Sequence, residues 1–110
     1  MATWKDFEKI DIRVGTVTGT EDFKEAKMPA YKLWIDFGDL GVKQSSAQAT
    51  KYYKKEDLLG KQVICIVNFP KKQIANFFSE VLVMGAYNGS KEDVVLLQVE
   101  REVINGAKIG

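Results

Sequence analysis

The chain contains no histidine and only one cysteine, and both shortages exclude classes of chemistry. Without histidine, the protein lacks the most frequent general base and the most frequent metal ligand. Cys65 stands alone in the apolar run Val63–Val67, which excludes a disulfide framework and favours a buried core thiol. A single buried cysteine without histidine also leaves no ligand set for zinc.

Long apolar runs are absent as well. No stretch approaches the length of a membrane-spanning helix, and residues Met1–Asp6 lack the apolar core of a signal peptide. We therefore expect a cytoplasmic protein without membrane insertion. The 110 residues fit one domain that buries its own core, and no repeat, linker or low-complexity tract divides them.

Catalytic motifs are also missing. The sequence has no phosphate-binding glycine loop, no metal-ligand spacing and no context that would activate the cysteine. Three acidic pairs lie in polar stretches, where solvated surface explains them better than an acid–base pair: Glu21-Asp22, Glu56-Asp57 and Glu92-Asp93. We predict that the protein is not an enzyme and uses no cofactor or metal.

The positive charge is concentrated in the middle third of the chain. Residues 43–72 hold seven lysines against Glu56 and Asp57, a local net charge of +5, whereas the whole chain carries +1. If the fold gathers these lysines on one face, an anionic partner is expected, although lysines are often only solvated surface.

Short strands dominate the predicted secondary structure. Apolar residues alternate with polar ones in two segments, 10–16 and 31–37, which is the period of a half-buried strand. Gly15 within the first segment and Gly19 shortly after it indicate a bulge or a sharp bend. A turn at 38–41 and a short strand at Val42–Ser46 follow.

The second half mixes one helix with further strands. Residues 47–58 are compatible with a short helix that Ser46 could cap. Residues 63–69 are apolar enough to be buried on both faces, and 80–86 and 94–99 are further strands separated by the Asn88-Gly89 turn. Asn105-Gly106 is another turn. This order predicts an all-β protein, namely an OB-fold: a five-stranded Greek-key barrel with a short helix between strands 3 and 4.

Several motifs resemble one family. Asp11-Ile12-Arg13-Val14-Gly15 resembles the opening of tRNA-binding domains of the methionyl-tRNA synthetase C-terminal type. Further motifs of this family follow in the same order over nearly the whole chain: Lys43–Gln48, Leu59–Val63, Val67–Pro70 and Ser79–Val83. Within the family, the closer likeness is to a branch of small chaperones connected with protein export, which Val94–Gln98 also resembles.

The resemblance implies a single tRNA-binding-type OB-fold domain over 1–110, with a barrel at about 10–87 and a C-terminal dimerisation extension at about 88–110. It also implies a homodimer with tRNA, unfolded or preprotein polypeptides and the protein-translocation machinery as partners. The N-terminal segment, Val94–Val99 and Val103-Ile104 would supply the dimer interface, although the last two could equally be a lid over the chain's own barrel. A dimerisation or scaffold appendage without its own ligand is the alternative function.

Candidate tRNA-binding residues lie on the predicted strand 2–3 face and on the loop between strands 4 and 5, the L45 loop. They are Lys43, Gln44, Ser45, Ser46, Lys51, Asn68, Lys71, Lys72 and Ser79. Lys71 and Lys72 are favoured because they follow the rigid Pro70 and flank apolar side chains. Asn68 could instead hold the turn at Pro70, and Lys51 could be a plain solvated lysine.

Candidate peptide-binding residues are apolar side chains near the same loop: Phe69, Ile74, Phe77 and Phe78, with Met28 and Tyr31 as weaker ones. Phe69 could simply end a buried strand, and Tyr31 could belong to an amphipathic one. If Phe77-Phe78 is extended, its side chains point to opposite faces, so one phenylalanine is core and the other is open.

Overall fold

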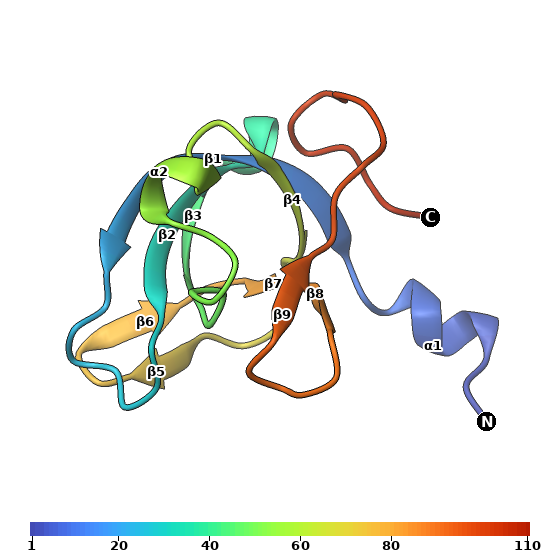
Figure 1. The fold of residues 1–110 in the computed structure, drawn as a ribbon. Coiled ribbons are helices and arrows are strands. Elements are labelled where there is room, and N and C mark those ends of the chain that lie inside the picture. The colour runs from blue at the N-terminus through green and yellow to red at the C-terminus, as the bar shows by residue number, and fades with distance from the viewer.

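The computed structural model describes residues 1–110. Five antiparallel strands in the order β3-β2-β1-β4-β7 form a nearly closed barrel (Figure 1). Two separate two-stranded hairpins, β5–β6 and β8–β9, are attached to it. The elements are α1 (Trp4–Glu8), β1 (Ile12–Asp22), β2 (Tyr31–Asp36), η1 (Gly38–Leu40), β3 (Val42–Ala47), α2 (Lys55–Leu58), β4 (Gln62–Ile66), β5 (Lys72–Ile74), β6 (Phe77–Ser79), β7 (Leu82–Val83), β8 (Gly85–Tyr87) and β9 (Val94–Leu96).

The barrel strands follow the predicted alternation. Leu33 and Ile35 on β2 are fully buried in the main core, where they meet Val63 and Cys65 of β4. Gly15 is required by packing, because a Cβ atom there would lie 2.6 Å from Cγ2 of Ile35. The irregularity of β1 falls between Val17 and Gly19, which agrees with the predicted bulge. The predicted OB-fold is thereby confirmed.

The predicted helix over 47–58 is wrong for most of its length. Only Lys55–Leu58 is helical, and Ser46 belongs to β3 instead of capping a helix. Ala47 and Ala49 are both buried, two residues apart, which is the period of extended chain. Alanine has a high helix propensity, but burial of these two side chains in the barrel core overrides it.

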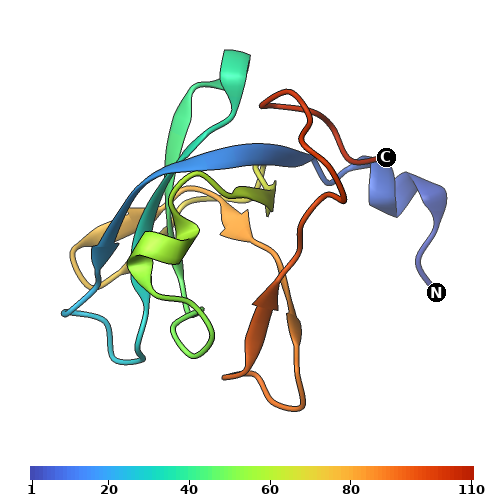
Figure 2. The ribbon, with the colours of Figure 1, turned by 45° about the horizontal axis from the view of Figure 1, so that its top comes forward.

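Two predicted strands are shorter than expected. β4 ends at Ile66, so Phe69 is not buried but 45% exposed. The predicted strand 80–86 is divided at Met84, whose N–H donates to Ile64 O on β4 while its carbonyl accepts from Leu97 N. The chain therefore leaves the barrel sheet at Met84 and continues as the β8–β9 hairpin (Figure 2).

The C-terminal segment returns to the barrel. Gly106 N donates to Val14 O at 2.7 Å, and Val14 N donates to Ala107 O at 2.9 Å, so the segment lies along β1. Gly106 adopts φ 88°, which confirms the predicted turn. Leu96 on β9 is buried in the main core, as a lid would be, whereas Ile104 is 81% exposed. None of the helices has the length and apolar composition that a membrane span requires.

Candidate ligand-binding site

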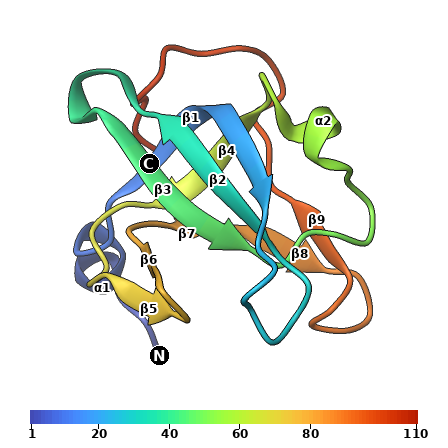
Figure 3. The same ribbon diagram turned by 90° about the vertical axis from the view of Figure 1, so that its left-hand side faces the viewer.

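The L45 loop, residues 67–81, carries the β5–β6 hairpin beside the barrel strands (Figure 3). Phe77 fixes this hairpin to the body of the domain. Its ring centroid lies 5.4 Å from that of Phe23 and 6.3 Å from that of Trp34, both in edge-on geometry. The ammonium nitrogen of Lys32 lies 5.2 Å from the same ring. These contacts hold the loop in place, which lowers the entropy it would lose on binding a ligand.

The question of which phenylalanine faces outward has a clear answer. The exposed fraction is 7% for Phe77 and 49% for Phe78. The two side chains alternate along β6, as neighbours on a strand must. Phe77 therefore has a packing role, whereas Phe78 is available on the surface.

Hydrogen bonds of polar side chains connect β3 to the L45 loop. The hydroxyl of Ser45 donates to Val81 O at 2.7 Å and lies 3.1 Å from the Ser79 hydroxyl, which also accepts from Ser46 N. Ser45 and Ser79 are buried. Gln44 and Glu80 bond reciprocally, because Glu80 N donates to Gln44 O and the Glu80 carboxylate accepts from Gln44 N. In this structure these groups position the loop against the barrel.

Asn68 connects the end of β4 to the N-terminal linker, residues 9–11 between α1 and β1. Its side-chain oxygen accepts from Asp11 N at 2.9 Å, and its amide nitrogen donates to Lys9 O at 2.8 Å. Both ends of the amide are thus used within the chain. The contacts run to the linker and not to the turn at Pro70.

The candidate lysines differ in how free their charges are. Lys71 and Lys72 are exposed and make no ion pair, and Lys43 is half-buried on β3 without one. Lys51 donates to a carboxylate oxygen of Asp93 at 2.6 Å, and this hydrogen bond raises the pKa of the Lys51 ammonium. The charge of Lys51 is therefore already balanced by a neighbour.

A groove of about 610 Å³ lies between the two hairpins. It brings together five of the predicted residues, which come from both the tRNA-binding and the peptide-binding sets: Ser46, Phe69, Lys72, Ile74 and Ser79. Lys43, Lys51, Lys71, Phe77 and Phe78 lie outside it. Residues predicted for the two functions therefore line one groove.

Other groove residues escaped the sequence analysis. The β8–β9 side contributes Met84, Gly85, Tyr87 and Lys91, and β7 contributes Leu82. Tyr87 is 64% exposed and Leu82 is 48% exposed. The available signal was the predicted strand 80–86, which was expected only as a strand of the barrel. No cluster of three or more cysteine, aspartate or glutamate side chains is placed to hold a metal ion.

A five-stranded antiparallel barrel with a short helix between β3 and β4 defines the class as OB-fold domains. Residues 12–108 match the family model of the putative tRNA binding domain, and the chain belongs to this family.

Known relatives agree. The crystal structure of chaperone CsaA from Bacillus anthracis has a TM-score of 0.96 and 56% identity, covering 100% of this chain and 99% of that one. The CsaA chaperone protein from Picrophilus torridus has a TM-score of 0.92 and 55% identity, covering 100% of both chains. The methionine–tRNA ligase of Thermococcus onnurineus is 37% identical over 108 residues, but these are 96% of this chain and 14% of the ligase. The likeness to the ligase thus concerns one binding domain of a much longer enzyme.

Proposed function

We propose that the chain is a non-catalytic, homodimeric OB-fold protein of the CsaA type that binds tRNA in the cytoplasm through its L45 loop. The observation that carries this proposal is the pair Lys71 and Lys72, which are adjacent, exposed and free of ion pairs behind Pro70. OB-folds bind nucleic acids through this loop and the strand 2–3 face. Lysines that neutralise phosphates release counterions, which makes the affinity depend steeply on salt.

The other predicted residues take two kinds of role in this proposal. Lys43, Gln44 and Ser46 on β3 extend the contact surface from the loop onto the barrel. Ser45, Ser79 and Asn68 position the loop and the N-terminal linker through the hydrogen bonds described above. Lys51 contributes least, because Asp93 already neutralises it.

A tRNA titration of a charge variant tests this role. Replacing Lys71 and Lys72 by alanine should weaken binding of bulk tRNA and lower the slope of log affinity against log salt by about 1 to 2. The matched control is Lys54→Ala with Lys108→Ala, which removes the same charge from two exposed positions that make no ion pair and lie outside the L45 loop and the β1–β2 loop. Equal slopes for the Lys71/Lys72 variant and the wild type would refute the proposal.

A second activity, binding of unfolded or preprotein polypeptides, is favoured by the groove. Phe69 and Tyr87 line it with exposed rings, and most of its lining is hydrophobic. Exposed apolar patches mark interaction sites, and the CsaA relatives are called chaperones. The protein-translocation machinery is a further partner in this proposal, since such clients would be export substrates.

Suppression of aggregation tests the second activity. The protein should slow the aggregation of a chemically unfolded client, and Phe69→Ser should weaken this effect because it removes an apolar ring from the groove. Phe78→Ser is the matched control, because Phe78 is as exposed as Phe69 but lies outside the groove. If neither the wild type nor any variant delays aggregation of the client, the chaperone activity is refuted.

The homodimer is supported by α1, which extends away from the barrel with no buried residue (Figure 1). Trp4 is 83% exposed and Phe7 is 41% exposed. A second copy would cover these rings together with the exposed side chain of Ile104. The competing function, a dimerisation or scaffold appendage without its own ligand, predicts a dimer that binds neither tRNA nor unfolded client.

A further inference from the structure

The β8–β9 hairpin has one covered edge and one free edge. Met84 O accepts from Leu97 N, and Asn88 N donates to Asp93 O, so the backbone of these two residues faces β9. In an antiparallel ladder every second residue turns its N–H and C=O toward the partner strand. Ala86, which pairs with Val95, is therefore also directed at β9, while Gly85 and Tyr87 direct their backbone groups away from it.

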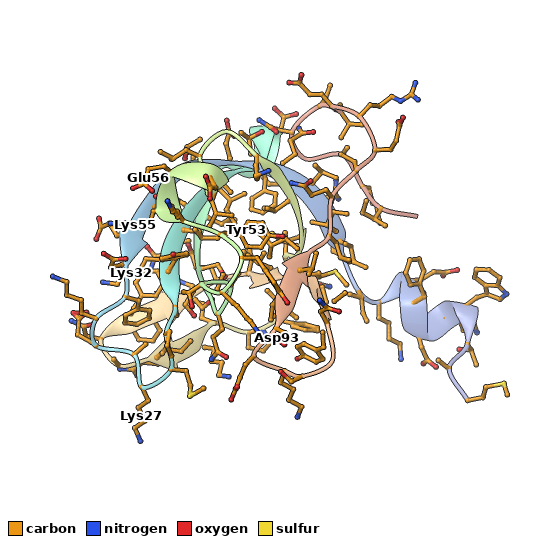
Figure 4. The ribbon with its side chains drawn as sticks, in the orientation of Figure 1. Lys27, Lys32, Tyr53, Lys55, Glu56 and Asp93 are labelled. Carbon is orange, nitrogen blue, oxygen red and sulfur yellow. The ribbon has the colours of Figure 1, made fainter.

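Those outward groups of Gly85 and Tyr87 have no partner elsewhere in the chain. β8 pairs only with β9, and neither residue takes part in a hydrogen bond of the loops, turns or side chains. Both residues line the groove, whereas Ala86 does not. The opposite edge of the hairpin is different, because Leu96 N on β9 donates to the hydroxyl of Tyr53 at 3.0 Å (Figure 4).

We propose that the groove takes an extended polypeptide segment as an additional strand on the free edge of β8. This inference rests on the proposed binding of unfolded polypeptides and adds its mode. Main-chain hydrogen bonds to Gly85 and Tyr87 give affinity without demanding a sequence, which suits unfolded clients. Every second side chain of the segment would enter the apolar groove beside Phe69, Leu82 and Val94.

The charges at the groove define the preferred segment further. Lys72 and Lys91 line the groove, are exposed and make no ion pair. Glu80, the one acidic residue of the lining, accepts from Gln44 N at 3.0 Å and keeps its charge. Two lysines against one carboxylate leave the lining net positive. The segment that fits is one with alternating apolar residues and an acidic residue at its end.

Backbone methylation of a probe peptide tests the pairing directly. The probe is a fluorescein-labelled peptide of about eight residues, within the usual length of a strand, with alternating valines and threonines and a terminal aspartate. Two versions carry N-methyl groups on alternate amides, one on the valines and one on the threonines. Fluorescence polarisation measures the binding of all three to the wild-type protein.

One methylated version should lose about tenfold or more in affinity and the other little, because only one set of amides faces β8 and each lost hydrogen bond costs about 1 kcal/mol. The apolar alternation and the direction of the added strand together determine which set that is: the valine amides face β8 in an antiparallel segment and the threonine amides in a parallel one. Equal affinity of both methylated versions would overturn the inference but leave peptide binding intact. Absence of binding by the unmethylated probe and by unfolded client alike would remove the proposed chaperone activity itself.

A protein variant gives an independent reading. Tyr87→Pro removes the outward N–H without removing a bond of the β8–β9 ladder, and the control Tyr87→Ala removes the same ring but keeps that N–H. Probe affinity should fall further for Tyr87→Pro than for Tyr87→Ala, and Lys91→Gln should weaken the aspartate-ended probe more than an asparagine-ended one. If Tyr87→Pro instead dissociates the dimer in light scattering, β8 pairs with a second copy, and the inference is wrong.

Discussion

Phe77 and Phe78 are neighbours with opposite environments, and they show how far the sequence determines single residues. The alternation of side chains along an extended segment predicts that one ring is buried and the other open. It does not predict which one, because that depends on the distant side chains of Phe23 and Trp34 that receive Phe77. The local pattern predicts that buried and exposed side chains alternate, and the tertiary contacts determine which of the two phenylalanines is buried.

Truncation of these two rings should have unequal effects on stability. We expect Phe77→Ala to lower the free energy of unfolding by about 3 kcal/mol, because it empties a packed site between the L45 loop and β2. Phe78→Ala should change it by less than about 0.5 kcal/mol, as at other exposed positions. Urea unfolding measures both, and equal losses would contradict the assignment of Phe77 to the interior.

The buried thiol of Cys65 should make stability depend on alkaline pH. Burial raises the pKa of this thiol from 9.0 to about 12, so the folded state holds the proton more tightly than the unfolded chain. The stabilisation is complete below pH 9 and is lost as the pH rises toward 12. Between pH 9 and 10 the free energy of unfolding should fall by about 1 kcal/mol.

Cys65→Ala separates this effect from packing. The variant should be less stable at every pH because it leaves a cavity in the core. Its free energy of unfolding should nevertheless stay nearly constant between pH 9 and 10. Burial also raises the pKa of Tyr31 above its ordinary value of 10.0, and the resulting loss of stability falls mainly above pH 10, where tyrosine ionises in the unfolded chain. A decline as steep in the variant as in the wild type would assign the pH dependence to other groups.

At the scale of elements, the sequence predicts strands better than their ends. The alternation in 31–37 is confirmed in β2, because Leu33 and Ile35 are buried whereas Lys32, Trp34 and Asp36 are only half-buried. The helix over 47–58 is wrong, since Ala47 and Ala49 have small side chains that fit either helix or strand and the barrel decides between them. Met84 illustrates a third limit: it bonds to β4 on one side and to Leu97, the residue after β9, on the other, which no local pattern encodes.

The docking of the C-terminal segment on the barrel depends on Gln62. Its amide nitrogen donates to Val103 O at 2.7 Å, and its oxygen accepts from Val103 N at 3.1 Å. Gln62→Ala should lower the free energy of unfolding by about 1 to 2 kcal/mol. It should also speed hydrogen exchange at the amides of Val103 and Gly106, as NMR can measure.

Gln48→Ala is the matched control, because Gln48 is exposed and its side chain makes no hydrogen bond in the structure. Exchange at Val103 and Gly106 should be unchanged in this control. Unchanged exchange in Gln62→Ala as well would show that the backbone bonds to β1 hold the segment by themselves.

At the scale of the whole molecule, the sequence predicts the barrel and the family, but not how the candidate binding residues are arranged. Several ordered motifs cover the chain, and residues 12–108 belong to the tRNA-binding domain family. The groove could not be predicted from the sequence, because it is formed by β5, β7 and the β8–β9 hairpin, which are separated in sequence and come together only in the fold.

The proposed dimer should depend on the free helix α1. We expect Trp4→Ala with Phe7→Ser to convert the dimer to a monomer at micromolar concentration, because both exposed rings would lose their place in the interface. Size-exclusion chromatography with light scattering measures the mass. Leu40→Ala, an exposed apolar residue of η1, should leave the mass unchanged. A wild-type protein that is already monomeric at that concentration would contradict the dimer.

The central claim, that the L45 loop contacts tRNA, is tested most directly by lysine footprinting. The protein is acetylated with and without saturating tRNA, and mass spectrometry compares the reactivity of each lysine. We expect tRNA to protect Lys71 and Lys72 most strongly, and to leave the exposed Lys54 and Lys108 as reactive as in the free protein. Full reactivity of Lys71 and Lys72 in the presence of bound tRNA, with protection elsewhere, would contradict the account.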